Sequence, residues 1–408
     1  MPLEKAKLKY AVLIADGMAD YPLQELGGKT PIEAADTPAM DLLARKGMLG
    51  VARTIPDRMT AGSDVANMSI LGYNPAEYYA GRGPLEAANL GVEMKEGDVA
   101  FRCNLITVSG DILEDYSAGH ISSQEAEQLI KCIDRGIGGG NFRFYPGVSY
   151  RHLMLASGGT ALGLHETECK PPHDIAGQTV SRNLPKGGGA QHLIKLMSDS
   201  RVLLETHEIN QVRIDLKENP ANMIWLWGQG VKPRMPRFSD MFGVSGSVIS
   251  AVDLLKGLGR IIGLDVIDVP GATGYYDTNY EGKAEAGVKS LKNHDFVFVH
   301  VEAPDEAGHN GDLRQKITAI ERFDHAVVRR FLDAAKKQPG LRILVMPDHP
   351  TPVALRSHAA DPVCFGIYGP DILPGNAAAY SESEARKSGL IFDKGHELMA
   401  YFINGRKV

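Results

Sequence analysis

Carboxylate and imidazole side chains, which bind divalent metal ions, stand just after apolar runs of this sequence. The first run ends before one aspartate, the second before an aspartate and a histidine four residues apart, and the third before an adjacent Asp-His pair. A further histidine precedes a fourth apolar run. These residues are Asp16, Asp305, His309, Asp348, His349 and His358. Six such ligands exceed what one tetrahedral ion needs, and their mixed chemistry suits Mn²⁺ or Zn²⁺, so the pattern predicts two ions.

Each of these residues taken alone has a more ordinary explanation. An aspartate after a strand commonly forms a turn or caps a helix, and a lone histidine is more often a surface or satisfied buried residue than a ligand. Their convergence on one place is what favours metal binding. In an open parallel α/β sheet, ligands bind beyond the carboxyl ends of the strands, where these residues are expected to lie.

Ser63 is the candidate nucleophile. The segment 60–67 (TAGSDVAN) indicates a glycine turn followed by a helix start, so Ser63 would lie at the positive end of the helix dipole. A serine hydroxyl is a poor nucleophile at neutral pH, and coordination to a divalent ion lowers its pKa enough for attack on phosphorus. The alternative is that Ser63 or Asp64 is simply the N-cap of that helix.

The elements that would position these residues are those of an α/β protein. Compact apolar runs at residues 8–15, 295–302 and 341–346 predict buried strands. An amphipathic helix is expected over residues 313–337, and another from Thr37-Pro38 to Gly47. Strands that alternate with helices favour βαβ units and a mainly parallel sheet covered on both faces.

The middle of the chain has a different character. It carries two Gly-Gly-Gly runs and the turn-forming pair Pro171-Pro172, which we interpret as an inserted second domain. A strand at 223–227 is then expected to rejoin the core sheet, with a helix at 247–258 after it. The expected segments are a first core part at 1–96, the insertion at 97–221 and a second core part at 222–408.

Composition excludes several classes of function. The chain has 408 residues and 44.1 kDa, with 43% hydrophobic and 23% charged residues, as in folded globular proteins. Its formal net charge of -6 gives no basic excess for nucleic acid or a membrane surface. Neither Gly28-Lys29-Thr30 nor Gly228-Gln229-Gly230 has the glycine spacing of a nucleotide-binding loop. The four cysteines form no C-x-x-C pair, and the apolar stretch 10–15 is too short for a signal peptide, so a cytoplasmic location is expected.

Four segments match the motifs of a known family in their order: 16–20, 60–87, 300–309 and 347–349. Together they resemble the archaeal-type, 2,3-bisphosphoglycerate-independent phosphoglycerate mutases of the alkaline phosphatase superfamily, over nearly the whole chain. The Asp-Xaa-Xaa-Xaa-His spacing followed by Asp-His is shared more widely in that superfamily, so it indicates the class better than the substrate. The resemblance implies an alkaline-phosphatase-like, mainly parallel sheet sandwiched by helices, with an inserted smaller α/β cap domain.

The resemblance implies two divalent metal ions, Mn²⁺ with Zn²⁺ or Co²⁺ as substitutes, and no 2,3-bisphosphoglycerate. The ion next to the nucleophile would be held by Asp16, Ser63, Asp348 and His349, and the second ion by Asp305, His309 and His358. We prefer His358 to His396 as the last ligand because it lies in a loop before a strand, as in the family. His396 stands instead at the apparent start of a C-terminal helix.

The implied reaction is the interconversion of 3-phosphoglycerate and 2-phosphoglycerate in glycolysis and gluconeogenesis. Ser63 would take the phosphoryl group and form phosphoserine, and the glycerate would turn within a closed site and take the group back on its other hydroxyl. A mutase differs from a phosphatase chiefly by excluding water while phosphoserine exists. An inserted cap that closes over the metal site would do this.

The cap residues expected to bind the substrate are His120, Arg151, His173 and Asp174. Arginine suits a bidentate grip on a carboxylate, and histidine or aspartate can shuttle protons to the glycerate hydroxyls. Lys283 could contact the phosphoryl group or be a solvated loop lysine. Arg82 could bind an anion or brace the loop between two glycines.

Three rival functions stay open from the sequence. A phosphomonoesterase of the same superfamily would release inorganic phosphate, and a homoserine-kinase-like phosphotransferase would require ATP. A silent metal-binding sensor would have no use for Ser63. The expected partner is a small-molecule substrate, with no nucleic acid and no membrane, and a homo-oligomer is left open.

Overall fold

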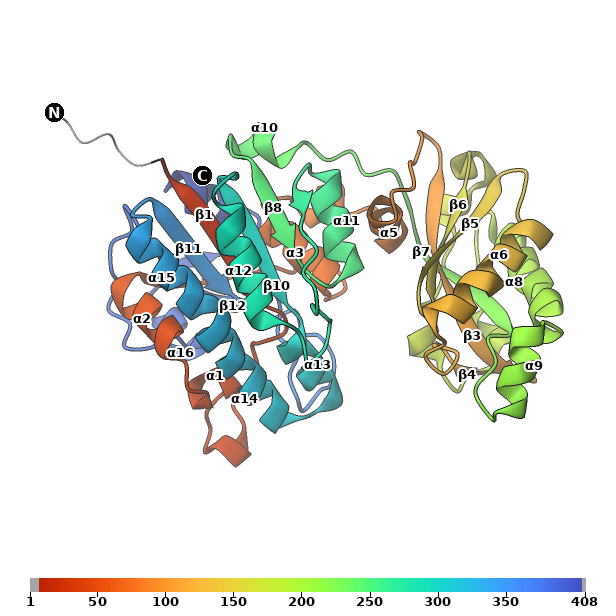
Figure 1. The fold of residues 1–408 in the computed structure, drawn as a ribbon, viewed down its shortest axis with the longest axis horizontal. Coiled ribbons are helices and arrows are strands. Elements are labelled where there is room, and N and C mark those ends of the chain that lie inside the picture. Colours follow the sequence, from red (N-terminus) through yellow and green to blue (C-terminus); the bar gives the residue numbers. More distant parts are fainter. Residues whose placement is uncertain (1–6, 406–408) are drawn as a thin grey trace. The chain divides into compact units, whose positions relative to one another are not determined.

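A computed structural model describes residues 7–405, and their contacts divide the chain into two units (Figure 1). Unit 1 takes in the residues up to Tyr79 and those from Met235 on, and unit 2 is the continuous segment Ala80–Arg234. Unit 2 is therefore wider at both ends than the insertion expected at 97–221. Residues 1–6 and 406–408, the outer ends of the two expected core parts, lie outside the described residues.

Unit 1 is built on an eight-stranded sheet. Its strands are, in spatial order, β13 (Ile391–Phe392), β2 (Met48–Ala52), β12 (Val363–Tyr368), β11 (Leu341–Met346), β1 (Lys9–Ala15), β10 (Phe296–Val301), β8 (Gly246–Ile249) and β9 (Asp265–Val266). The pairs among β11, β1, β10, β8 and β9 are parallel, and β12 runs antiparallel to both of its neighbours. The expected α/β class with a mainly parallel sheet is confirmed, and the three strands predicted from the apolar runs are β1, β10 and β11.

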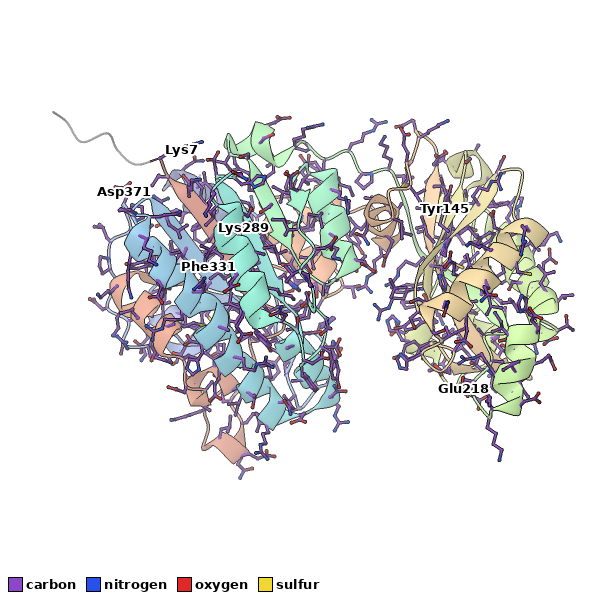
Figure 2. The ribbon with its side chains drawn as sticks, in the orientation of Figure 1. Lys7, Tyr145, Glu218, Lys289, Phe331 and Asp371 are labelled. Carbon is purple, nitrogen blue, oxygen red and sulfur yellow. The ribbon has the colours of Figure 1, made fainter. Side chains whose placement is uncertain are left out.

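Helices bury one face of this sheet under a continuous apolar core. They are α1 (Pro31–Ala34), α2 (Pro38–Lys46), α12 (Tyr280–Ser290), α14 (Leu313–Arg322), α15 (Arg329–Lys337) and α16 (Glu382–Lys387). Phe331 of α15, labelled in Figure 2, is wholly buried in this core. The helix expected over 313–337 is present, but a π-helical segment, Phe323–Val328, joins α14 to α15. Its buried Asp324 accepts the N–H groups of Ala39 and Met40 at the start of α2, which ties the two helices together.

The opposite face packs against a second set of helices. Side chains alternate between the two faces along β1, so Tyr10 lies on the face opposite the first core. Its ring packs edge-on against Phe402, with ring centroids 5.6 Å apart. The remaining helices of unit 1 are α3 (Ser63–Ile70), α4 (Pro75–Tyr78), α10 (Phe238–Phe242), α11 (Asp253–Ile261), α13 (Ala303–Asn310) and α17 (Glu397–Asn404), with a 3₁₀ turn at Gln24–Leu26. The prediction of one helix over 247–258 is wrong, because β8 occupies the first part and α11 begins only at Asp253.

Unit 2 has a sheet of its own, formed by β3 (Val99–Ser109), β4 (Ile112–Asp115), β5 (Phe142–Val148), β6 (Arg151–Ala156) and β7 (Met223–Val231). All its pairings are antiparallel. Its helices are α5 (Arg82–Asn89), α6 (Ser123–Gly136), α7 (Val180–Asn183), α8 (Ala190–Glu205) and α9 (Glu208–Asp215), with 3₁₀ turns at Gly159–Leu162, Leu164–Glu166 and Pro172–Ile175.

The strand expected to rejoin the core sheet does not do so. β7 pairs with β3 along most of its length, and Trp225 and Trp227 belong to the core of unit 2. Helix α5 also packs against β3, which brings residues 80–96 into unit 2. These two elements account for the difference from the expected boundaries. Within residues 7–405, no helix is both long enough and apolar enough to cross a membrane.

Candidate active site

The parallel strands of unit 1 bring the predicted ligands to one edge of the sheet. Ala15 of β1 lies in register with Val301 of β10, and Ile14 lies in register with Met346 of β11. The next polar residues of each strand therefore emerge together beyond the carboxyl ends. Asp16 follows β1 directly, Asp305 stands in the first turn of α13 after β10, and Asp348-His349 follows β11.

The first cluster gathers Ser63 with three ligand-type side chains. Ser63 Oγ lies 3.1 Å from His349 Nε2 and 3.3 Å from Asp16 Oδ2. His349 Nε2 lies in turn 3.5 Å from Asp16 Oδ1 and 3.6 Å from Asp348 Oδ2. The structure thus brings together the four residues that the resemblance groups around the nucleophile.

Ser63 is not used as a helix cap. It is the first residue of α3, the N-cap is Gly62, and no side chain caps that end of the helix. Asp64 also lies inside the helix, where it accepts a hydrogen bond from the Tyr79 hydroxyl at 2.7 Å. The N-cap alternative for Ser63 or Asp64 is therefore wrong, and the Ser63 hydroxyl is turned towards Asp16 and His349.

The carboxylate of Asp348 is fixed by three donors, one of which is the N–H of His349, at 2.8 Å from Oδ1. The N–H of Gly17 donates to Oδ1 at 3.0 Å, and Asn67 Nδ2 of α3 donates to Oδ2 at 2.8 Å. Gly17 has a φ of +61°, and a Cβ there would lie 2.6 Å from Asp305 Oδ1. Only glycine fits this approach, so the turn after β1 is shaped for the cluster.

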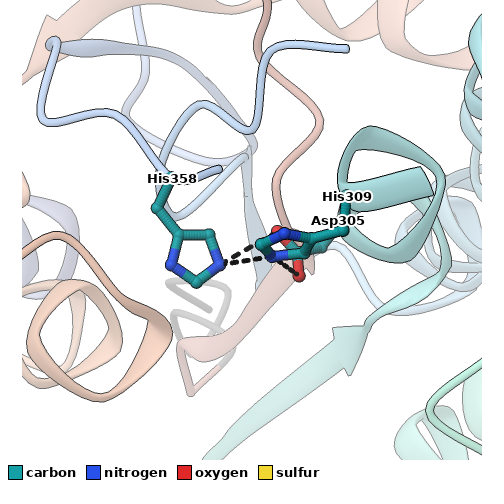
Figure 3. Close-up of side chains that lie close together, drawn as sticks. All are labelled: Asp305, His309 and His358. Carbon is teal, nitrogen blue, oxygen red and sulfur yellow. Dashed lines mark hydrogen bonds and ion pairs between the residues drawn. The ribbon is translucent and has the colours of Figure 1, made fainter. Parts of the chain in front are cut away.

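The second cluster is Asp305, His309 and His358 (Figure 3). His309 Nε2 lies 3.3 Å from Asp305 Oδ2, and His358 Nε2 lies 3.4 Å from Asp305 Oδ1. The two Nε2 atoms are 2.8 Å apart, while each Nδ1 faces a backbone carbonyl, of Arg356 for His309 and of Ala61 for His358. A carbonyl at Nδ1 favours the tautomer that leaves the Nε2 lone pair free for a metal ion. His396 is not in any cluster of metal-ligand type among the described residues.

Burial and like charge act on Asp16, whereas opposite charge outweighs burial at His309. Burial, together with the carboxylates of Asp348 and Asp305, raises the pKa of Asp16 well above its usual value. Burial opposes the charge on His309, yet Asp305 raises the pKa of His309 to about 8. Three buried carboxylates beside four imidazoles form a donor set that divalent cations satisfy. The residues therefore fit two divalent metal ions.

Sequence reasoning missed His300, which is fully buried at the end of β10. Its Nε2 lies 3.3 Å from Asp16 Oδ2 and 4.0 Å from Asp348 Oδ2. The signal was a histidine inside an otherwise apolar strand, five residues before Asp305. Lys283 lies on α12 and is fully buried, so the alternative of a solvated loop lysine is wrong.

In unit 2, three of the four expected substrate residues gather around aromatic rings. The guanidinium of Arg151 lies 5.0 Å from the ring centroid of Tyr150, and the His120 ring lies 5.9 Å from the same ring. His173 packs edge-on against Trp227 at 5.4 Å, and Asp174 Oδ1 lies 3.7 Å from His173 Nε2. Asp174 is therefore adjacent to the group through His173.

Two more arginines join this group in unit 2. Arg102 of β3 holds its guanidinium 4.7 Å from the Trp227 ring centroid, and Arg82 lies 5.7 Å from it. Burial and the charges of Arg82 and Arg151 outweigh Glu86 and lower the pKa of Arg102. The sequence does not identify Arg102 as a site residue, because an arginine in the middle of a strand is ordinarily an edge or surface residue.

Comparison with known proteins places this chain in a family. Residues 44–210 match the family model described as 2,3-bisphosphoglycerate-independent phosphoglycerate mutase. A protein of that name from Methanosarcina barkeri is 52% identical over 401 residues, which cover 98% of this chain and 100% of the relative. This chain belongs to the 2,3-bisphosphoglycerate-independent phosphoglycerate mutases.

Solved structures agree with this membership. A Pyrococcus horikoshii protein superposes with a TM-score of 0.82 and 31% identity, over 98% of this chain and 97% of that one. The cofactor-independent phosphoglycerate mutase of Thermoplasma acidophilum superposes with a TM-score of 0.66 and 26% identity, over 97% and 99% of the two chains. The 2,3-bisphosphoglycerate-independent mutases are isomerases, and these structures share the fold over 97–98% of this chain.

Proposed function

We propose that this chain interconverts 3-phosphoglycerate and 2-phosphoglycerate through a phosphoserine formed on Ser63. The observation that carries the proposal is the place of the Ser63 hydroxyl, within 3.5 Å of both Asp16 and His349 and free of any capping role. Ser63 Oγ gives up its proton and bonds to phosphorus, the bond from phosphorus to the glycerate oxygen breaks, and that oxygen takes up a proton and becomes a hydroxyl. The second glycerate hydroxyl then loses its proton, attacks the phosphoserine and so reverses the step. Because Ser63 carries the phosphoryl group itself, the reaction needs no 2,3-bisphosphoglycerate.

The two clusters would hold two divalent ions, for which we propose Mn²⁺, with Zn²⁺ or Co²⁺ as substitutes. Asp16, Ser63, Asp348 and His349 would hold one, and Asp305, His309 and His358 the other. When bound, such ions lower the pKa of a coordinated hydroxyl and neutralise charge on the transferring group. The backbone carbonyls at Nδ1 of His309 and His358 keep both rings oriented for this purpose.

Unit 2 would supply the groups that hold glycerate. His120, Arg151, His173 and Asp174 stay the proposed residues. Arg82 and Arg102 join them because both lie over Trp227, which is linked to Tyr150 beneath Arg151 by the rings of His173 and Tyr116. Of the two alternatives for Arg82, we favour anion binding. Arginine binds a carboxylate through two parallel hydrogen bonds, which fixes orientation as well as charge.

Phosphorus NMR tests this function directly. Mn²⁺-loaded protein is mixed with 3-phosphoglycerate without 2,3-bisphosphoglycerate, and the expected result is a 2-phosphoglycerate signal that a chelator abolishes. Inorganic phosphate alone would identify a phosphomonoesterase, and exchange only with ATP would identify a homoserine-kinase-like phosphotransferase. No change under any condition would leave the silent metal-binding sensor.

A further inference from the structure

A line of buried polar side chains lies behind the first cluster. Lys283, His300 and Glu302 are exposed by 0%, 0% and 3%. Burying charged groups costs several kcal/mol each unless they are paired, and apolar residues would avoid that cost. Their place next to Asp16 therefore needs an explanation beyond stability.

The side chain of Lys283, on α12, is held by hydrogen bonds to the end of β10. Its Nζ donates to Glu302 Oε2 at 2.5 Å and to the backbone carbonyl of His300 at 2.9 Å. Both acceptors belong to β10 or the residue that follows it. Both of these hydrogen bonds therefore join the Lys283 side chain to the end of β10.

Glu302 is fixed by three parts of unit 1. Its Oε2 accepts from Lys283 of α12, and its Oε1 accepts the N–H of Ala251 at 2.9 Å and the hydroxyl of Ser250 at 3.0 Å. Ser250 and Ala251 follow β8 directly. His300 Nδ1 faces the same Oε1 at 3.2 Å. The carboxylate has no freedom to move, so it fixes the imidazole ring of His300.

The other nitrogen of His300 reaches Asp16. Nε2 lies 3.3 Å from Asp16 Oδ2, whereas the other oxygen, Oδ1, lies 3.5 Å from His349 Nε2. Both oxygens of Asp16 also lie within 3.4 Å of Ser63 Oγ, so His300 touches the same carboxylate that faces the proposed ion site.

We propose that Lys283, Glu302 and His300 form a buried relay that orients the Asp16 carboxylate for metal binding. The inference rests on the proposed function for its metal ions, and it makes Lys283 a positioning residue that acts through Asp16 rather than by contact with the phosphoryl group. Partners of this kind around a metal ligand typically change metal affinity by about 10- to 100-fold when removed.

The test is calorimetric titration of Mn²⁺ alone into the metal-free full chain. We expect Lys283→Met to weaken one of the two binding events by about 10- to 100-fold and to leave the other, at Asp305, His309 and His358, unchanged. At saturating Mn²⁺ the KM for 3-phosphoglycerate should equal that of the wild type. Glu302→Gln, which keeps the shape of the side chain, should weaken the same event and serves if Lys283→Met does not fold.

Arg342→Met is the matched control. Arg342 is also a buried cation of this sheet, but it lies in β11 at the end away from Asp348 and donates to the carbonyls of Phe402 and Pro370. It should lower thermal stability without changing Mn²⁺ affinity. The proposal is overturned if Lys283→Met behaves in the same way, or if it raises the KM with metal affinity intact. If the wild type binds two ions but exchanges no phosphoglycerate, the proposed function fails while the titration still tests the relay.

Discussion

The chemistry of the site depends on where single side chains point. Ser63 could have capped α3, but Gly62 takes the N-cap position and leaves the hydroxyl directed at Asp16 and His349. The first turn of a helix adds positive potential at this point, which favours an approaching phosphoryl group. The hydroxyl is thus both oriented and placed where an anionic substrate is stabilised.

Ser63→Ala should abolish exchange while leaving the fold intact. Without the hydroxyl no phosphoserine can form, so we expect a loss on the order of 10³-fold or more in kcat at saturating Mn²⁺. Ser69→Ala is the control, because Ser69 lies buried in the same helix and outside the cluster. Rapid quench with ³²P-labelled substrate should show label on the wild type and on Ser69→Ala only. Label retained by Ser63→Ala would contradict the mechanism.

Among single residues, the sequence identifies candidate site residues that directly follow strands, but not those that lie inside strands. Asp16, Asp305 and Asp348 stand where an apolar run ends, which is a visible signal. His300 and Arg102 lie within strands, where a polar residue predicts nothing until the neighbouring strand is known. Their partners, Asp16 and Trp227, are more than a hundred residues away in the chain, so only the folded sheet brings them together.

Among the elements of unit 1, the junction of α1 and α16 carries an unusual carboxyl group. Glu382, the first residue of α16, is buried, and its Oε2 accepts a hydrogen bond at 2.8 Å from Thr30, the N-cap of α1. A helix N-terminus favours negative charge, but burial dominates and raises the pKa of Glu382 to about 7. The folded protein therefore holds a proton here that the unfolded chain would release near pH 4.5.

This raised pKa predicts how stability changes with pH. Between pH 4.5 and 7 the folded state binds the proton more tightly, so the stability that Glu382 contributes falls as pH rises through this window and then levels off. From pH 5 to pH 8, Glu382→Gln should gain about 2 kcal/mol relative to the wild type. Denaturant unfolding of the chelated protein at the two pH values measures this.

Glu384→Gln in the same helix is the control for this experiment. The hydrogen bond from Lys387 lowers the pKa of Glu384, so its replacement should bring no gain at high pH. Equal pH responses of the two variants would mean that Glu382 is ionised in the folded state.

The elements themselves were predictable where hydrophobic periodicity is strong. Strand β11 and helix α2 agree with prediction within one residue at their ends. The prediction of one helix over 247–258 failed because β8 is only four residues long and fully buried. Its apolar run is therefore indistinguishable from the start of a helix. The sheet that β7 joins could not be predicted, since strand partners are set by tertiary packing rather than by the strand's own residues.

The proposed function divides two tasks between the units of the whole molecule. The seven proposed metal ligands, Ser63 included, lie in unit 1, and the residues proposed to hold glycerate lie in unit 2. Unit 2 is one continuous segment with its own apolar core, so it meets the conditions for folding alone. Unit 1 resumes at Met235, and a hydrogen bond holds the chain there: the Tyr73 hydroxyl donates to the Pro236 carbonyl at 2.9 Å.

Replacing residues 80–234 by a short Gly-Ser linker should turn the enzyme into a weak phosphatase. The remaining chain keeps both clusters, so it should bind two Mn²⁺ ions as the full chain does and still form phosphoserine. If unit 2 retains the glycerate and excludes water, as proposed, its removal should let water take the phosphoryl group. Phosphorus NMR should then show inorganic phosphate from 3-phosphoglycerate and no 2-phosphoglycerate, whereas the full chain shows the reverse.

Two controls make this outcome interpretable. Segment 80–234 expressed alone should give a cooperative thermal transition by circular dichroism, which shows that the division into units is real. The linker variant carrying Ser63→Ala should release no phosphate, which assigns the hydrolysis to the same nucleophile. Persistent 2-phosphoglycerate formation by the linker variant would mean that unit 1 alone holds and turns the glycerate. His120, Arg151, His173, Asp174, Arg82 and Arg102 would then have no part in substrate binding, because a product of the exchange would have formed in their absence.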